Sequence, residues 1–395
     1  MAAAGETRPS RFGAALREGE RVTPLELFFD LVFVLALTQC TALMAHNPSW
    51  EGLAQGLLVL GMLWWAWTAY SWLTSVIDPE EGAVRLVIFG AMAALLVVSL
   101  CVPEAFGDLA LVFALAYGAV RVAQIGLFML ASPDDDSLRH SVLGLAVSTA
   151  VAVTLLVLAS LFDGAAQGAL WALALFLDMA GPYFFGSEGW KLVPEHFAER
   201  HGLIVIIALG ESIVAIGVGA TSALDLGIGA AAVLGVALTA AMWWVYFDVV
   251  AIVSGRRLAE AEVGRVQNEM ARDSYSYLHL PMVAGIVLVA LGMKKTIGHF
   301  DEHLDTVLAF ALLGGLAAYL LGHVAFRYRH VHTINRQRLL LAIVLLILVP
   351  VATAIPALAA LAIANALIWA MIVYETRSYG EGRHQVRRPQ TAEAP

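Results

Sequence analysis

Charged side chains are scarce in this chain of 395 residues. Asp, Glu, Lys and Arg together make up 14% of it, against about 25% in a typical soluble domain. Hydrophobic residues make up 60% and the mean hydropathy is +0.78, which leaves too little polar surface to meet water around a protein of this size. The composition therefore excludes a soluble fold and predicts one polytopic membrane domain with short loops.

Other scarce or absent features exclude further classes of protein. Only two cysteines occur, Cys40 and Cys101, both inside apolar runs, so we expect no disulfide framework and no thiol metal site. A net charge of −9 offers no basic surface for nucleic acid. The first twenty residues hold no apolar core of a signal peptide. No G-x-S-x-G, H-E-x-x-H or phosphate-cradling glycine loop is present, and we assign no catalytic residue, metal ligand or cofactor.

Long apolar runs take up most of the chain instead. A bilayer core of about 30 Å requires roughly 20 apolar residues per helix, and this length predicts an all-α bundle of about twelve transmembrane helices. They are expected at 23–45, 52–74, 83–102, 106–131, 139–161, 166–186, 197–219, 226–253, 275–297, 304–326, 337–353 and 356–375. Pro350 and Pro356 bracket the last turn, which favours two helices there rather than one.

The basic residues predict the orientation of these helices. With the N-terminus in the cytoplasm, twenty of the 23 Lys and Arg residues fall on the cytoplasmic side. Lys294 and Lys295 lie outside and Arg121 lies within a span. This asymmetry follows the positive-inside rule and predicts that both termini are cytoplasmic in a multi-pass protein.

A weak internal repeat divides the expected helices into two sets of six. A Trp pair followed by an aromatic residue occurs at 62–67 and again at 241–246, and Tyr117 with Arg121 parallels Tyr319 with His323. Six helices in each half would give both halves the same orientation; chance similarity of apolar helices is the alternative. The predicted parts are a cytoplasmic segment 1–22, a first repeat 23–186, a second repeat 187–375 with an amphipathic surface helix at 255–273, and a disordered cytoplasmic tail 376–395.

Ionisable side chains inside a span are costly, so they are the candidate functional residues. Glu26 and Asp30 are four residues apart in the first span and share a helix face. Asp178 lies mid-helix in the sixth span and Glu211 in the centre of the seventh. Arg200 precedes Glu211 by eleven residues, about 16 Å along the helix, so Glu211 must find its partner on another helix.

Arg121 is the only basic residue well inside a span, and Asp30, Asp178 and Glu211 are its candidate partners. The sequence does not choose among them, and a buried pair that only holds helices together is an equal alternative to a functional one. His201, His279 and His323 add a second polar layer that could relay protons or merely hydrogen-bond neighbouring helices.

Two strings resemble a known family. Residues 21–33 read RVTPLELFFDLVF and residues 196–212 read HFAERHGLIVIIALGES; both are similar to signatures of the bacterial low temperature requirement A family, over roughly residues 20–375. The resemblance implies a polytopic protein of the bacterial plasma membrane. The string FFDLVFVLALT at 28–38 is more faintly similar to the pore-lining helix of endolysosomal-type potassium channels, although Phe29 replaces the serine of that string.

These observations favour a transporter or channel for ions or small solutes, with membrane lipids as its surroundings and a path lined by the buried acidic residues. A sensor or scaffold in cold adaptation with a structural polar core is the first alternative. A membrane-embedded lipid-handling enzyme, with Glu199, His201 and Glu211 as acid–base groups, is the second. The sequence leaves open whether the chain forms a homodimer.

Overall fold

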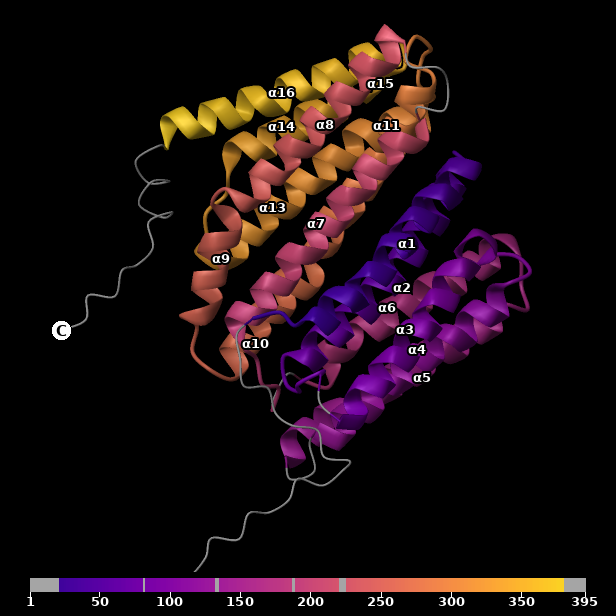
Figure 1. The fold of residues 1–395 in the computed structure, drawn as a ribbon, viewed down its shortest axis with the longest axis vertical. Helices are drawn as coiled ribbons and strands as arrows, with labels where there is room; N and C mark the ends of the chain where they lie inside the picture. The colour runs from indigo at the N-terminus through magenta and orange to yellow at the C-terminus, as the bar shows by residue number, and fades with distance from the viewer. Residues whose placement is uncertain (1–20, 81, 132–134, 187–188, 220–224, 380–395) are drawn as a thin grey trace, which may run out of the picture. The chain divides into compact units, whose positions relative to one another are not determined.

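The computed structural model describes residues 21–80, 82–131, 135–186, 189–219 and 225–379. Within these ranges the regular structure is entirely helical (Figure 1), which confirms the expected all-α bundle. Eleven helical segments of the described chain are long and apolar enough to cross a membrane. The protein is therefore a multi-pass membrane protein.

The helices pack into two compact units. Unit 1 comprises Met1–Val32 and Trp65–Phe197, and unit 2 comprises Phe33–Trp64 and Ala198–Pro395. The boundaries fall inside three continuous helices: α1 (Pro24–His46), α2 (Trp50–Thr74) and α7 (Pro194–Gly219). Each unit is described by itself below.

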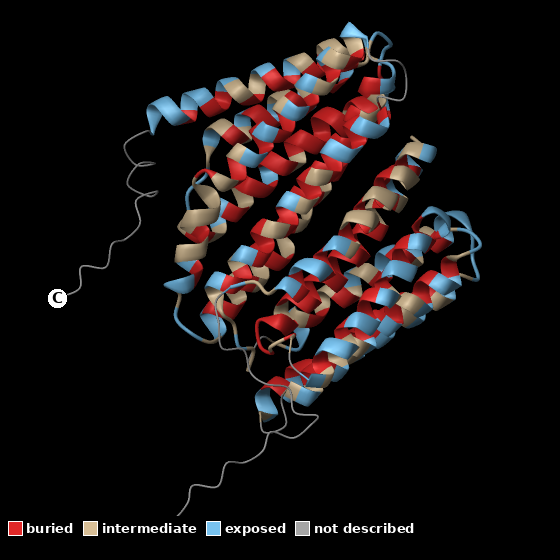
Figure 2. Ribbon diagram, in the orientation of Figure 1, coloured by how far each residue is buried: buried red, intermediate tan, exposed pale blue. Residues whose placement is uncertain are grey.

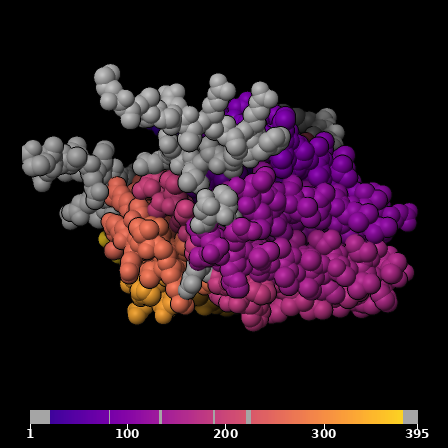
Figure 3. All heavy atoms as spheres, turned by 90° about the horizontal axis from the view of Figure 1, so that it is seen from below, coloured from indigo at the N-terminus to yellow at the C-terminus, as the bar shows by residue number. Residues whose placement is uncertain are grey.

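In unit 1, four consecutive helices pack in sequence order: α3 (Gly82–Cys101), α4 (Ala110–Ala131), α5 (Asp136–Ala159) and α6 (Gly164–Phe184). The turn η1 (Val102–Glu104) follows α3. Asp135 begins α5 by accepting a hydrogen bond from the backbone N–H of Leu138 at 3.0 Å, which satisfies one free N–H group of the first turn. The purple and magenta helices form one closely packed surface in the space-filling view (Figure 3).

The outward faces of these helices are apolar as well. Leu86 on α3, Val122 on α4 and Phe176 on α6 are each at least 65% exposed, although their helices bury another face in the unit (Figure 2). Large apolar side chains exposed in such numbers indicate a lipid-facing surface rather than a water-facing one.

In unit 2, α11 (His279–Gly298) and α13 (Gly315–Val331) pack against each other, α14 (Arg336–Ile347) packs on α13, and α16 (Ala357–Ser378) packs on α8 (Leu226–Phe247). The contact between α11 and α13 depends on glycine. A Cβ atom at Gly285 would lie 2.5 Å from the backbone oxygen of Gly315, closer than atoms can approach. Small residues let membrane helices pack at this short distance.

Two π-helical turns interrupt the spans of unit 2. The turn η2 (Arg272–Tyr277) joins α10 (Arg265–Ala271) to α11, and the turn η3 (Phe310–Gly314) joins α12 (Thr306–Ala309) to α13. π-turns inside helices occur frequently at functional sites because they shift the faces that side chains present.

The structure differs from the sequence-based prediction at two segments. The span expected at 337–353 is divided between α14 and the short helix α15 (Val349–Ala352), because Pro350 cannot continue the hydrogen-bond pattern of α14. The stretch 255–273 is not one amphipathic helix: α9 (Val250–Ala259) ends within it and α10 begins within it. Gly264, with a backbone φ of +104°, makes the turn between them.

Other predictions are only partly covered by the structure. The N-terminal segment up to residue 20 and the tail from residue 380 lie outside the described residues, and α16 continues to Ser378 beyond the expected tail boundary at 376. The division into two six-helix repeats and the cytoplasmic position of both termini stay predictions.

Candidate functional site

The partner of Arg121 is Asp178. In unit 1 the Arg121 guanidinium lies 3.2 Å from Asp178 Oδ1 and donates to Thr149 Oγ1 at 2.8 Å. Thr149 donates in turn to Asp178 Oδ1 at 3.0 Å, and Tyr117 donates to Oδ2 at 3.1 Å. These four side chains come from α4, α5 and α6 and form what we call the Arg121 cluster, in which both carboxylate oxygens are satisfied.

The charged pair of the Arg121 cluster is completely buried, since both side chains are 0% exposed. The attraction between two buried charges offsets their loss of hydration only when further hydrogen bonds support them, as Thr149 and Tyr117 do here. The cluster therefore favours the structural alternative for Asp178: an ion pair that ties three helices together.

Asp30 is held by a tryptophan of unit 1. Trp67 Nε1 of α2 donates to Asp30 Oδ1 at 2.9 Å, and both residues are fully buried. Trp67 thus acts as a buried hydrogen-bond donor, and a partner of this kind is the usual requirement for an indole N–H inside a protein.

Glu26 has two structural partners, also in unit 1. It forms a capping box with Thr23, because Thr23 N–H donates to Glu26 Oε2 at 2.8 Å and Glu26 N–H donates to Thr23 Oγ1 at 3.3 Å. Its other oxygen, Oε1, lies 2.9 Å from His196 Nε2, and His196 Nδ1 lies 3.2 Å from Ser75 Oγ. This buried Ser–His–Glu chain joins α1, the turn directly after α2 and the start of α7.

Glu211 differs from the other acidic candidates. It is 2% exposed in α7, and Thr38 Oγ1 of α1 donates to its Oε2 at 2.5 Å; both residues belong to unit 2. Within the described residues, no basic side chain lies within 4 Å of this carboxyl group. Lys294 of α11 is the one cation whose charge acts on it. Glu211 is therefore a buried acidic group with a hydroxyl donor and no direct ion pair.

Histidines and tyrosines gather in unit 2 around the π-turn η2. This His–Tyr cluster consists of His201, Tyr246, Tyr275, His279, Tyr319, His323 and His330, each less than 9% exposed. The His279 ring lies 5.2 Å from His201 and 5.1 Å from Tyr275, and Tyr246 lies 5.8 Å from His323, measured between ring centres. The structure thus brings His201, His279 and His323 into one buried layer.

The hydrogen bonds of His279 show which of its two ring nitrogens carries the proton. His279 Nδ1 lies 3.1 Å from the Ser274 carbonyl oxygen, which can only accept, so this nitrogen carries the proton. In the neutral ring, Nε2 is then the acceptor for the Tyr246 hydroxyl at 2.9 Å. Chains of hydrogen bonds of this type can move protons. Within the described residues, no group of three His, Cys, Asp or Glu side chains could hold a metal ion.

Arg200 is 1% exposed in α7, and His201 next to it joins the His–Tyr cluster. Arg200 and His201 belong to unit 2, whereas the Arg121 cluster belongs to unit 1.

Sequence reasoning missed one buried ion pair. Arg338 of α14 forms a two-pronged contact with Glu375 of α16, with Nε to Oε1 at 3.1 Å and Nη2 to Oε2 at 3.0 Å. Both side chains are 7% exposed. The sequence counted Arg338 only as a positive charge of a cytoplasmic loop. No signal in the sequence pairs it with a glutamate 37 residues away.

The comparisons with known proteins agree with this architecture. Residues 21–373 match the family of the bacterial low temperature requirement A protein. The chain belongs to this family. It is also 32% identical, over 311 residues, to a protein of Rhizobium meliloti (strain 1021) described as uncharacterized, and the match covers 75% of each chain. No solved structure matches.

The family assignment confirms the resemblance carried by the two signature strings. Both strings contain residues of the candidate sites: the first includes Glu26 and Asp30, and the second includes His196, His201 and Glu211. The low temperature requirement A signature therefore coincides with the buried polar groups of both units.

Proposed function

We propose that this low temperature requirement A protein is a transporter or channel for protons or small cations, and that Glu211 lies in its path. The supporting observation is the environment of Glu211: a membrane-spanning helix, 2% exposure, and the hydroxyl groups of Thr38 and Thr41 as hydrogen-bond partners. A charged carboxylate in such a place is expensive unless a cation neutralises it. A carboxyl group without a fixed cation gains from binding a proton or a mobile cation, which is the property a transport site needs.

The contrast with Asp178 sharpens this assignment. Asp178 has a permanent cationic partner in Arg121 and hydroxyl donors on both oxygens. A mobile cation gains little at a carboxylate that is already neutralised. We therefore assign a role in transport to Glu211 and a structural role to Asp178.

The His–Tyr cluster supplies a second group of titratable side chains in the same unit. His201 and Glu211 lie on α7, ten residues or about 15 Å apart along the helix axis. Histidine can shuttle protons through its two ring nitrogens. The two sets of residues support proton movement through unit 2 better than transport of a bulky apolar solute.

Flux measurements on purified protein in liposomes test the proposal. We expect the native chain to dissipate an imposed proton or potassium gradient, and Glu211→Gln to reduce the rate at least about tenfold, equivalent to about 1.4 kcal/mol. Glu302→Gln is the matched control, because Glu302 is 66% exposed and pairs only with the exposed His299. Leakage no faster than that of empty liposomes, or full activity of Glu211→Gln, would refute the proposal.

A sensor or scaffold is the second candidate, and the Arg121 cluster supports it. A buried ion pair that connects three helices, with hydrogen bonds to both oxygens of its carboxylate, holds unit 1 together and needs no substrate. If the native chain remains folded in liposomes but moves no protons and no sodium, potassium or chloride ions, we would assign a structural role to the buried polar groups of the whole chain.

A further inference from the structure

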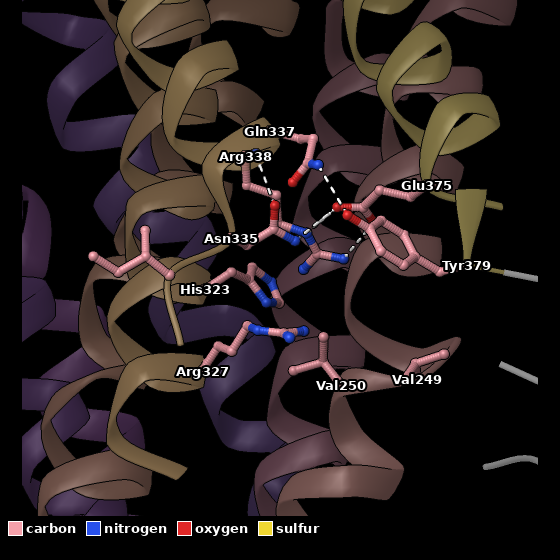
Figure 4. Close-up of a pocket in the computed structure, with 10 residues that line it drawn as sticks. Val249, Val250, His323, Arg327, Asn335, Gln337, Arg338, Glu375 and Tyr379 are labelled. Carbon is pink, nitrogen blue, oxygen red and sulfur yellow. Dashed lines mark hydrogen bonds and ion pairs between the residues drawn. The ribbon is translucent and has the colours of Figure 1, made fainter. Parts of the chain in front are cut away.

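Unit 2 contains a cavity at the end where α13 stops, α14 starts and α16 stops (Figure 4). Its volume is about 170 Å³, room for about five water molecules at ~30 Å³ each. Its wall includes the polar side chains of His323, Arg327, Asn335, Arg338, Glu375 and Tyr379. By the distribution of basic residues, this end of the unit is the cytoplasmic one.

The wall carries one positive charge in excess. The Glu375 carboxylate is occupied by the two-pronged contact with Arg338 and by Asn335 Nδ2, which donates to Oε1 at 2.8 Å. Arg327 is exposed, and within the described part of the chain its side chain makes one hydrogen bond, from Nε to Thr333 Oγ1 at 3.1 Å. The two terminal nitrogens of Arg327 are therefore free to donate to a ligand.

His323 gives an independent indication of a ligand. It is 1% exposed, and neither of its ring nitrogens has a hydrogen-bond partner within the described residues. A buried polar group left in this state destabilises the fold, and a ligand in the adjoining cavity would supply the missing hydrogen bond. The imidazole lies between Arg327 and Arg338 in the close-up (Figure 4).

We propose that this cavity binds a phosphate group with a single negative charge. Arg327, His323 and the guanidinium group of Arg338 hold the phosphate. Guanidinium groups bind phosphate oxygens with charge-assisted hydrogen bonds, and a single negative charge balances the excess of the wall. This chemistry is shared by the phosphate diester of an acidic phospholipid and by dihydrogen phosphate in solution.

A neighbouring groove favours the phospholipid. The groove holds about 450 Å³ and shares Val249, Val250, Arg327 and Tyr379 with the cavity. The rest of its wall is mainly apolar and includes Val253, Phe326 and Val331. A ligand that fills both spaces needs an anionic group joined to an apolar body, and basic pockets between membrane helices on the cytoplasmic side bind acidic lipid headgroups. This site is separate from Glu211 and does not depend on the transport proposal.

Native mass spectrometry of the full chain in detergent tests the site. Phosphatidylglycerol is the probe, phosphatidylcholine the zwitterionic comparison, and inorganic phosphate the soluble competitor. We expect one phosphatidylglycerol per chain to be retained, with phosphatidylcholine at least about tenfold weaker. Arg327→Gln should weaken phosphatidylglycerol binding about tenfold, the effect of one lost charge-assisted hydrogen bond. Arg336→Gln, an exposed arginine outside the cavity, is the matched control and should bind as the native chain does.

The outcomes separate the sources of the phosphate. Loss of the lipid in Arg327→Gln but not in Arg336→Gln supports a phospholipid ligand. Displacement of the lipid by millimolar inorganic phosphate, with the same dependence on Arg327, supports a phosphate site filled from solution. Equal binding of both lipids, or equal losses in the two variants, would overturn the proposal. His323→Gln, which keeps a donor and an acceptor, serves as a second variant if Arg327→Gln does not fold.

Discussion

Breaking the Arg121–Asp178 pair provides the most direct measurement of how unit 1 is held together. The two charges are 3.2 Å apart and both side chains are 0% exposed, so removing one partner leaves the other buried without compensation. Loss of one member of a buried pair costs about 3–5 kcal/mol. We therefore expect Arg121→Met and Asp178→Asn each to lower the free energy of unfolding by about 3–5 kcal/mol.

The double variant is the decisive test of this reasoning. With both charges removed, no uncompensated charge is left, and replacing a buried pair entirely is often neutral or mildly favourable. We expect Arg121→Met/Asp178→Asn to cost at least about 2 kcal/mol less than the sum of the single variants, a coupling typical of residues in direct contact.

Unfolding of the purified chain by SDS in mixed micelles, followed by circular dichroism, measures these free energies. Lys191→Met is the control for a basic residue of the same unit: its pair with Asp135 is 3.7 Å long and Lys191 is 58% exposed. Such exposed pairs contribute about 0–1 kcal/mol. Additive losses in the double variant would show that the Arg121 cluster is not a coupled ion pair.

Three further predictions concern unit 2. Thr38→Val removes the hydroxyl group that donates to Glu211 Oε2 and should cost about 1.5–3 kcal/mol in the same unfolding assay, whereas an unchanged value would mean that the hydrogen bond is not made. Gly285→Val forces apart α11 and α13 and should cost about 1–3 kcal/mol or more, while Gly229→Ala, where a Cβ meets open space, should cost nothing. Glu375→Gln leaves its arginine partner buried without a counter-charge and should cost about 3–5 kcal/mol; a loss below 1 kcal/mol would contradict the burial of that pair.

Hydropathy predicted the membrane class and most spans because a bilayer requires long apolar helices. Hydropathy could not predict the break between α14 and α15, since residues 339–352 are apolar throughout and only Pro350 marks the interruption. Nor could it place the turn at Gly264, where charged residues on both sides made one amphipathic helix the simpler prediction.

The polar partners were less predictable than the helices. The capping box of Glu26 is readable in the sequence as Thr-x-x-Glu, since it involves neighbours on one helix. The partner of Arg121 was not, because three acidic residues on different helices satisfied the same criterion. Arg338 and Glu375 lie at helix ends, where charged residues ordinarily meet water, and only their packing shows that both are buried.

The sequence by itself determined that this is a multi-pass helical membrane protein of the low temperature requirement A family, and it predicted which few ionisable residues lie at membrane depth. Only the tertiary structure decided how those residues are paired: Arg121 with Asp178, Asp30 with Trp67, and Glu211 with Thr38. The reason lies in the solvent. In a water-soluble helix, the polar face shows that the opposite, apolar face is the buried one. A helix in lipid is apolar on both faces, so its sequence does not show which face is buried. The rotation of each helix about its axis, which decides what its polar side chains meet, is therefore set by packing against its neighbours.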